Sequence, residues 1–328
     1  MSVGRCITSS SAARAGRRLP STASVKTRST GWLRVQARWG REARIESQSP
    51  PQFHDGVSAQ QHEVATVSEP PHTKRAGRLN ASASILPQLR HLGRWDPLPP
   101  MWLEGRFSFE FLRLIRDPVF RGDDVPPGLR RPVLLIPGFL AGDWTLRTQY
   151  DWLKRVGYRP RLAGLAFNVM YSEVMLKPLL DTLLALNRKT GARIAVVGHS
   201  RGGVLAKVLS HRKPDLVEQV ITLGSPLKDP FDVHPLTMAG VHAAHLFNAV
   251  RYRHPASVEM RFLRDLKAAP RVPTTSIYSR SDGVVNWKAC LRPDINAIEV
   301  RGSHVGLALN PEVYRILAHL LPAPWRQS

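Results

Sequence analysis

Residues 196–203 read Val196-Val197-Gly198-His199-Ser200-Arg201-Gly202-Gly203 and contain the pattern G-x-S-x-G with Ser200 at its centre. A short apolar run, residues 194–197, precedes the serine, and residues 204–209 have the apolar spacing of a buried helix face. A strand, a sharp turn and a helix are the setting of a nucleophile elbow. Gly198 and Gly202 suit that turn because a glycine has no Cβ that could clash. The motif therefore predicts a nucleophilic serine, and the alternative is a glycine-rich turn with an incidental serine.

Length and composition allow a sizeable core. The chain has 328 residues, enough for one large domain or two ordinary ones, and 43% of them are hydrophobic. The net charge of +22 is uneven: residues 1–40 carry eight Lys or Arg and no Asp or Glu, whereas residues 96–328 carry 32 basic and 20 acidic residues, which leaves +12. Two cysteines, Cys6 and Cys290, exclude a disulfide scaffold. No apolar run approaches the ~18 residues that a membrane-spanning helix needs.

Residues 1–95 are predicted to form a disordered basic extension without a catalytic role, because they lack the apolar surface that could offset the entropy of ordering. Their Arg- and Ser-rich start is also typical of an organellar transit peptide. A basic tail that contacts nucleic acid or anionic lipid is a second alternative. An upstream extension from a mis-set start, with Met101 as the true start, is a third. No specific nucleic-acid binding is expected, since no zinc-ligand spacing, stacking motif or recognition helix is present.

A helix is predicted at Met101–Arg116, where Phe107, Phe111, Leu114 and Ile115 recur three to four residues apart. One interpretation is a helix that lies on a lipid surface, with its arginines toward the headgroups. The favoured interpretation is a helix that packs its apolar side against the core of the following domain.

Residues 96–328 are predicted to form one α/β domain with a doubly wound, mostly parallel sheet, because apolar strands alternate with helical segments. The predicted strands are 132–136, a weaker one at 161–167, 192–197, 219–223, 274–278 and 295–300. The predicted helices are 144–153, 172–189, the segment after Ser200, and 311–321. The alternation of strands and helices is interrupted at about 229–270. We interpret this insert as a helical cap or lid over the pocket. His234, His242 and His245 in this insert follow no zinc spacing and are expected on helix surfaces.

A serine hydroxyl needs a base and an acid to become a nucleophile. His304 is the predicted base, because it follows the last strand on a loop that can reach the serine. His199, inside the elbow, is expected to point away from the reactive side and is not the base. Asp282, after the penultimate strand, is the predicted acid that orients the imidazole, and Asp229 and Asp232 are its rivals.

An oxyanion formed at the serine needs backbone N–H donors. One is predicted at Arg201, the residue after the nucleophile, at a helix N-terminus. The other is predicted in the loop after residues 132–136, at Phe139 or at the neighbouring Leu140.

Residues 132–321 resemble the α/β-hydrolase superfamily, on its lipase and carboxylesterase side. The matching segments are Leu135-Ile136-Pro137-Gly138-Phe139, Gly198-His199-Ser200-Arg201-Gly202-Gly203, Thr222-Leu223-Gly224-Ser225-Pro226, Ser281-Asp282-Gly283 and Gly302-Ser303-His304. The order Ser200, Asp282, His304 is the order of that superfamily. Proteins of this kind often have His-Gly before the oxyanion residue, whereas Pro137 precedes Gly138 here.

The resemblance implies a serine hydrolase that cleaves carboxylic esters through an acyl-enzyme, without a metal or organic cofactor. The expected partner is a small-molecule ester or lipid, with peripheral membrane contact and a cytoplasmic or peripheral-membrane location. An acyltransferase with the same triad and a catalytically idle lipid-binding module are the alternatives. In the predicted cap, Leu246 and Phe247 are expected to bind the acyl chain.

Overall fold

The computed structural model describes residues 98–252 and 256–322. Within them, six strands form one sheet in which all neighbours run parallel, in the order β2-β1-β3-β4-β5-β6. The strands are β1 (Pro132–Ile136), β2 (Arg159–Leu162), β3 (Ile194–His199), β4 (Val217–Leu223), β5 (Thr274–Ser279) and β6 (Asn296–Val300). The predicted strand at 161–167 is displaced toward the N-terminus, and the other five lie where the sequence predicts them.

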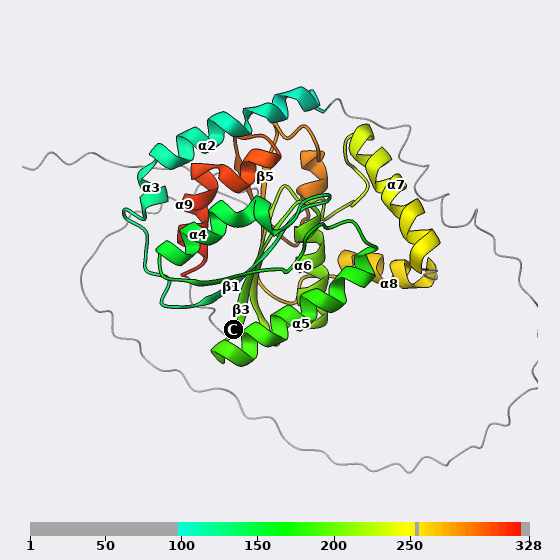
Figure 1. Ribbon diagram of the computed structural model, residues 1–328, viewed down its shortest axis with the longest axis horizontal. Coiled ribbons are helices and arrows are strands. Elements are labelled where there is room, and N and C mark those ends of the chain that lie inside the picture. Colours follow the sequence, from blue (N-terminus) through cyan, green and yellow to red (C-terminus); the bar gives the residue numbers. More distant parts are fainter. Residues whose placement is uncertain (1–97, 253–255, 323–328) are drawn as a thin grey trace, which may run out of the picture. The chain divides into compact units, whose positions relative to one another are not determined.

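Helices cover both faces of this sheet (Figure 1). On one face lie η3 (Met101–Arg106), α2 (Phe107–Arg116), α3 (Pro118–Arg121), η4 (Asp143–Leu146), α4 (Arg147–Arg155), η6 (Val305–Leu309) and α9 (Pro311–Leu320). On the other lie α5 (Ser172–Thr190), α6 (Arg201–Arg212) and α8 (Ala256–Lys267). The helix α7 (Pro235–Tyr252) joins α8 in the insert between β4 and β5, and η5 (Trp287–Cys290) follows β5.

The central strands are apolar throughout because they are buried on both sides. In β1, Leu134 and Ile136 pack into the core under α5 and α6, while Val133 and Leu135 pack into the opposite core. This alternation is the two-residue period of a strand between two helix layers. The predicted doubly wound, parallel α/β sheet with a helical insert between β4 and β5 is therefore confirmed.

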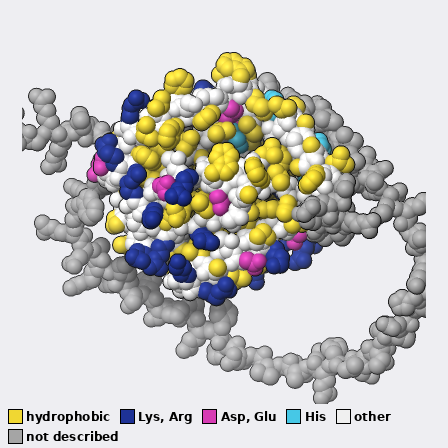
Figure 2. Space-filling view, viewed as in Figure 1, with side chains coloured by type: hydrophobic (Ala, Val, Ile, Leu, Met, Phe, Trp, Pro, Cys, Tyr) yellow, Lys and Arg dark blue, Asp and Glu magenta, His cyan; other side chains and the backbone are white. Residues whose placement is uncertain are grey.

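The predicted helix at 101–116 is present, but its packing differs from the prediction. Leu114 is fully buried, whereas Phe107, Phe111 and Ile115 each stay more than a third exposed. Figure 2 shows hydrophobic side chains across the upper part of this face of the molecule and Lys and Arg side chains at its lower left. The extension predicted at 1–95 and its boundary at residue 96 lie outside the described residues.

Across the described part of the chain, every helix is too short or too polar to cross a membrane.

Replacing Leu205 by Ala should lower the free energy of unfolding by about 2–5 kcal/mol, because Leu205 is fully buried in α6 and its loss leaves a cavity. The matched control is Leu246→Ala on α7, where the side chain is exposed and a change within about 0.5 kcal/mol is expected. Urea unfolding followed by circular dichroism measures both. Equal losses from the two changes would contradict the packing of α6 described above.

Candidate active site

Ser200 occupies a strained turn between β3 and α6. Its φ of 53° and ψ of −125° place a non-glycine residue at positive φ, which costs about 1–3 kcal/mol. Its N–H donates to the carbonyl of Leu223 at 2.7 Å, which ties the turn to the end of β4. The serine thus stands at the carboxyl end of the central strands, where open α/β sheets place ligand sites.

Close backbone approach explains the glycines of the motif. A Cβ on Gly198 would lie 2.5 Å from the carbonyl carbon of Gly202, and one on Gly202 would lie 2.2 Å from the carbonyl oxygen of Ile136. A Cβ on Gly203 would lie 2.1 Å from Ser225 Oγ, so the Ser225 turn packs directly on α6. No side chain fits at these three positions, which allows the sharp turn from β3 into α6.

The structure brings Asp282 and His304 together. His304 Nδ1 lies 2.6 Å from Asp282 Oδ2, and both residues are buried, with 5% and 2% of their surface exposed. The other carboxylate oxygen, Asp282 Oδ1, accepts the N–H groups of Val284 at 2.8 Å and Val285 at 2.7 Å. These bonds fix the carboxylate in the orientation that His304 requires. The rival Asp229 accepts instead from the N–H of Phe231 in its own turn.

Burial lowers the pKa of His304, but the charge and hydrogen bond of Asp282, together with the charge of Glu104, more than offset it. The net pKa of His304 is therefore raised, and its imidazolium form is stabilised.

Space for the pair of Asp282 and His304 depends on Gly224, which has a φ of +57°. A Cβ there would lie 3.1 Å from both Asp282 Oδ2 and His304 Nδ1.

His199 lies beside the predicted base. Its ring centroid is 4.9 Å from that of His304, and its Nε2 is 2.9 Å from the carbonyl oxygen of His304. Because a carbonyl only accepts, Nε2 of His199 carries the proton. Burial and the neighbouring His304 lower the pKa of His199 to about 4, which keeps it neutral at physiological pH. His199 supports the loop of His304, a position that the sequence motif did not indicate.

The loop after β1 approaches Ser200 closely. A Cβ on Gly138 would lie 3.1 Å from Ser200 Cβ, so the next residue, Phe139, comes near the serine. The N–H of Leu140 donates to the carbonyl of Asn168 at 3.3 Å, which leaves Phe139 as the better candidate for the oxyanion donor. At the start of α6 the first N–H groups have no partner within the helix, so the Arg201 N–H is the second candidate.

Asn168 holds this loop, and the sequence analysis missed it. Its Nδ2 donates to the carbonyl of Pro137 at 2.9 Å, and its N–H donates to that of Ala141 at 2.9 Å. The side chain is fully buried. No sequence pattern singles out an asparagine in the stretch after β2.

Among the described residues, no hydrogen bond joins Ser200 to His304. His199, the residue before Ser200, donates to the His304 backbone, so the two loops are in contact. Since His304 Nδ1 is engaged by Asp282, Nε2 is the nitrogen left for a proton transfer. Catalytic hydrogen bonds are often long in ligand-free enzymes and shorten when substrate binds.

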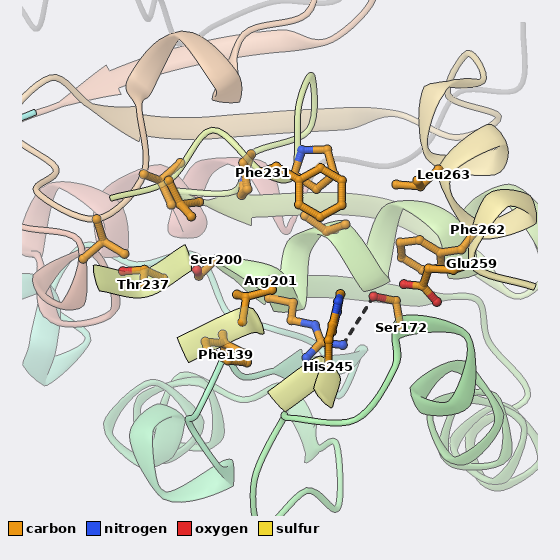
Figure 3. A pocket seen from close by; sticks show the side chains of 17 residues that line it. Phe139, Ser172, Ser200, Arg201, Phe231, Thr237, His245, Glu259, Phe262 and Leu263 are labelled. Carbon is orange, nitrogen blue, oxygen red and sulfur yellow. Dashed lines mark hydrogen bonds between the residues drawn. The ribbon is translucent and has the colours of Figure 1, made fainter. Parts of the chain in front are cut away.

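A mostly apolar pocket opens at Ser200 (Figure 3). Its apolar wall consists of Phe139, Val204, Pro226, Pro230, Phe231, Val233, Val241, Phe262, Leu263, Val284 and Val285. Helix α7 of the insert contributes to it through Thr237, Val241 and His245, which are four residues apart on one side of the helix. The prediction that Leu246 and Phe247 bind the acyl chain is wrong, because both are about two-thirds exposed on the other side of that helix.

One end of the pocket is polar. Arg201 Nη2 donates to Ser172 Oγ at 3.3 Å (Figure 3) and to the carbonyl of Met170. Burial lowers the pKa of Arg201 to about 10, and Glu259 opposes that shift. Burial, with the charges of Arg201 and His242, lowers the pKa of His245 to about 4, so His245 is neutral here. His245 thus lines the pocket and is half-buried, which corrects its predicted place on the helix surface.

Within residues 98–252 and 256–322, no group of three or more His, Cys, Asp or Glu side chains is placed to hold a metal ion.

Two further residues that the sequence analysis missed, Glu104 and Glu110, contact the loops of Asp282 and His304. The available signal was their charge, since they are the only acidic residues in an otherwise basic helix at 101–116.

Comparison with known proteins gives a match of residues 168–254 to the family model described as a PGAP1-like alpha/beta domain. No curated protein matches the chain. Similar solved structures include the lipase BlEst2 of Bacillus licheniformis, at 15% identity and a TM-score of 0.47 over 60% of this chain and 94% of that one. Another is a monoacylglycerol lipase of Paleococcus ferrophilus, at 14% identity and a TM-score of 0.42 over 60% of this chain and 96% of that one. The predicted resemblance to the α/β-hydrolase superfamily is confirmed for the fold.

Asp282→Asn should lower the pKa of His304, because it removes the charge and the strong acceptor that offset the burial of the imidazole. His304 should then stay neutral to a lower pH than in the unmodified protein. An NMR titration of the His304 ring measures the change, with Asp229→Asn as the control that leaves it unaltered. A His304 titration unmoved by Asp282→Asn would contradict the contact at 2.6 Å.

Proposed function

We propose that the protein is a serine hydrolase that cleaves carboxylic esters. The observation that carries the proposal is Ser200 at a strained turn, facing an apolar pocket, with the hydrogen-bonded pair Asp282 and His304 on neighbouring loops. A lone serine is a weak nucleophile, and a base oriented by a carboxylate is the arrangement that activates it. The match to an alpha/beta domain family is consistent with this proposal.

In the acylation step, Ser200 Oγ attacks the ester carbonyl while His304 Nε2 takes its proton. Asp282 remains ionised and stabilises the imidazolium. The negative charge that develops on the carbonyl oxygen is met by the N–H groups of Phe139 and Arg201. When the tetrahedral intermediate collapses, the C–O bond breaks and the alcohol leaves with the proton from His304.

In the deacylation step, water attacks the acyl-enzyme and gives a proton to His304. The second tetrahedral intermediate collapses to the carboxylic acid, and His304 returns the proton to Ser200 Oγ. Both steps need a neutral imidazole at their start. The rate should therefore fall as the pH drops through the raised pKa of His304.

Ser200→Ala and His304→Ala should each lower kcat by roughly 10⁶-fold, and the double variant should be barely slower than either. The reason is that the two residues act as one unit, so removing the second one takes away nothing more. Turnover of a p-nitrophenyl ester by the three variants measures this. Losses that multiply in the double variant would count against a shared mechanism.

A fluorophosphonate probe gives an independent check, because it reacts with an activated serine without turnover. Intact-mass analysis should show one adduct on the unmodified protein and none on Ser200→Ala. An adduct that persists on Ser200→Ala would show that another residue is the nucleophile.

The apolar wall supports a preference for medium acyl chains over acetate. Each buried methylene contributes about 0.8 kcal/mol, so four more enclosed carbons would give roughly 3 kcal/mol, or about 100-fold in kcat/KM. Val241→Trp should reduce this preference by filling the pocket, while Phe247→Asp, on the outer side of the same helix, should leave it unchanged. A series of soluble esters from acetate to octanoate measures it. Equal kcat/KM values along the series would contradict an acyl pocket.

A further inference from the structure

Two glutamates from the segment before the first strand bind the loops that carry Asp282 and His304. Glu104 in η3 accepts the N–H of Gly283 through Oε1 at 2.8 Å and the N–H of Val305 through Oε2 at 3.0 Å. One carboxylate therefore bridges the residue after the acid and the residue after the base.

Glu110, on α2, binds the other side of the base. Its Oε1 accepts the N–H of Ser303 at 2.7 Å, and its Oε2 accepts the Ser303 hydroxyl at 2.6 Å. His304 thus lies between two residues that the two glutamates hold. Gly306 leaves the space for this contact, since a Cβ there would lie 1.3 Å from Glu110 Oε2.

A structural role in folding alone explains these contacts poorly. Glu104 is 8% exposed, and in the described part of the chain no Lys or Arg forms an ion pair with Glu104 or Glu110. A buried carboxylate without a cation is costly unless N–H donors satisfy it. Three of the four bonds go to backbone N–H groups directly beside Asp282 or His304.

The two loops have a link of their own, but it lies at their stems. Ser279 and Ser281 both donate through Oγ to the carbonyl of Gly302, at 2.7 and 2.9 Å. That link reaches Ser281, on one side of Asp282, but none of its bonds reaches Gly283, Ser303 or Val305. The glutamates supply the constraint there, from residues 179 to 201 positions away in sequence.

We propose that Glu104 and Glu110 are positioning residues of the hydrolase, and that the segment Met101–Arg116 is a clasp that holds the acid and base loops in the geometry needed for proton transfer. This inference rests on the function proposed above. Neither glutamate touches the reacting atoms, and each acts through the loop that it binds.

Glu104 also acts by its charge. The charged and titratable groups that face His304 are Asp282 on the acid loop, His199 at the end of β3 and Glu104 on η3. The charge of Glu104 helps to raise the pKa of His304, against the lowering effect of burial. Removing that charge should shift the pKa of His304 down, and the imidazolium formed during catalysis would lose part of its stabilisation.

The test uses the full chain with Glu104→Gln, which keeps the side-chain shape but removes the charge and one of the two acceptors. We expect kcat to fall by roughly 10- to 100-fold with KM unchanged, since a misplacement of about 1 Å can cost about 100-fold. The acid limb of the pH–rate profile should move to lower pH. Asp181→Asn, an exposed carboxylate on α5, is the matched control and should change neither.

Glu110→Gln separates geometry from charge. It weakens the hold on Ser303 but retains Glu104, so kcat should fall while the acid limb stays in place. Hydrogen exchange supplies a readout that does not depend on activity. The amides of Gly283 and Val305 should exchange faster in Glu104→Gln, and that of Ser303 in Glu110→Gln, with the amides of β3 unchanged, which also shows that the variants fold.

Two results would overturn the clasp while the proposed function stands. One is an active protein whose Glu104→Gln variant keeps the unmodified kcat and acid limb. The other is a loss of kcat with the exchange of Gly283 and Val305 unaltered, because the effect would then not pass through the loops. A parent protein that neither hydrolyses esters nor reacts with the fluorophosphonate would instead overturn the proposed function, and the positioning role with it.

Discussion

The close approach of α6 to the ends of β1 and β3 imposes the geometry of the candidate site. A Cβ on Gly202 would lie 2.2 Å from the carbonyl oxygen of Ile136, so the helix can start there only with glycine. The chain must turn so sharply that Ser200 takes a positive φ, a conformation that the buried helix and the bond to Leu223 sustain. The same approach brings the loop after β1 to the N-terminus of α6, where a Cβ on Gly138 would lie 3.1 Å from Ser200 Cβ.

The parallel sheet then gathers the remaining groups, because all its strands end at the same edge. Ser200 follows β3, Asp282 follows β5 and His304 follows β6. The charge around the imidazole is opposite in sign to that of the chain, which carries a net +22. The carboxylates of Asp282 and Glu104 are satisfied mainly by N–H groups, so their negative charge remains available to a protonated imidazole.

Much of this arrangement could be predicted from the sequence, since β1 and β3 are short continuous apolar runs and the elbow glycines have a steric cause. Spacing could not distinguish Asp282 from Asp229 as the candidate acid, because both follow a strand. The fold separates them, since Asp282 contacts His304 and Asp229 accepts from Phe231 in its own turn. The sequence also could not predict which residues form the pocket wall. Apolar residues occur on several sides of α7, and only its docking determines that Val241 faces inward and Phe247 outward.

The segment 101–116 shows why periodicity misled there. Hydrophobic spacing predicts that a helix buries its aromatic side and exposes its charges. Here Glu104 and Glu110 face the loops, while Trp102 and Phe109 are at least 70% exposed. Besides the fully buried Leu114, charge-assisted hydrogen bonds hold the segment: Glu104 and Glu110 accept from the loops, and Arg106 Nη2 donates to the carbonyl of Ser281 at 3.1 Å. Such bonds depend on direction, whereas apolar burial does not. A helix attached in this way therefore fixes the orientation of the loops beside Asp282 and His304, which hydrophobic contact alone would leave free to shift.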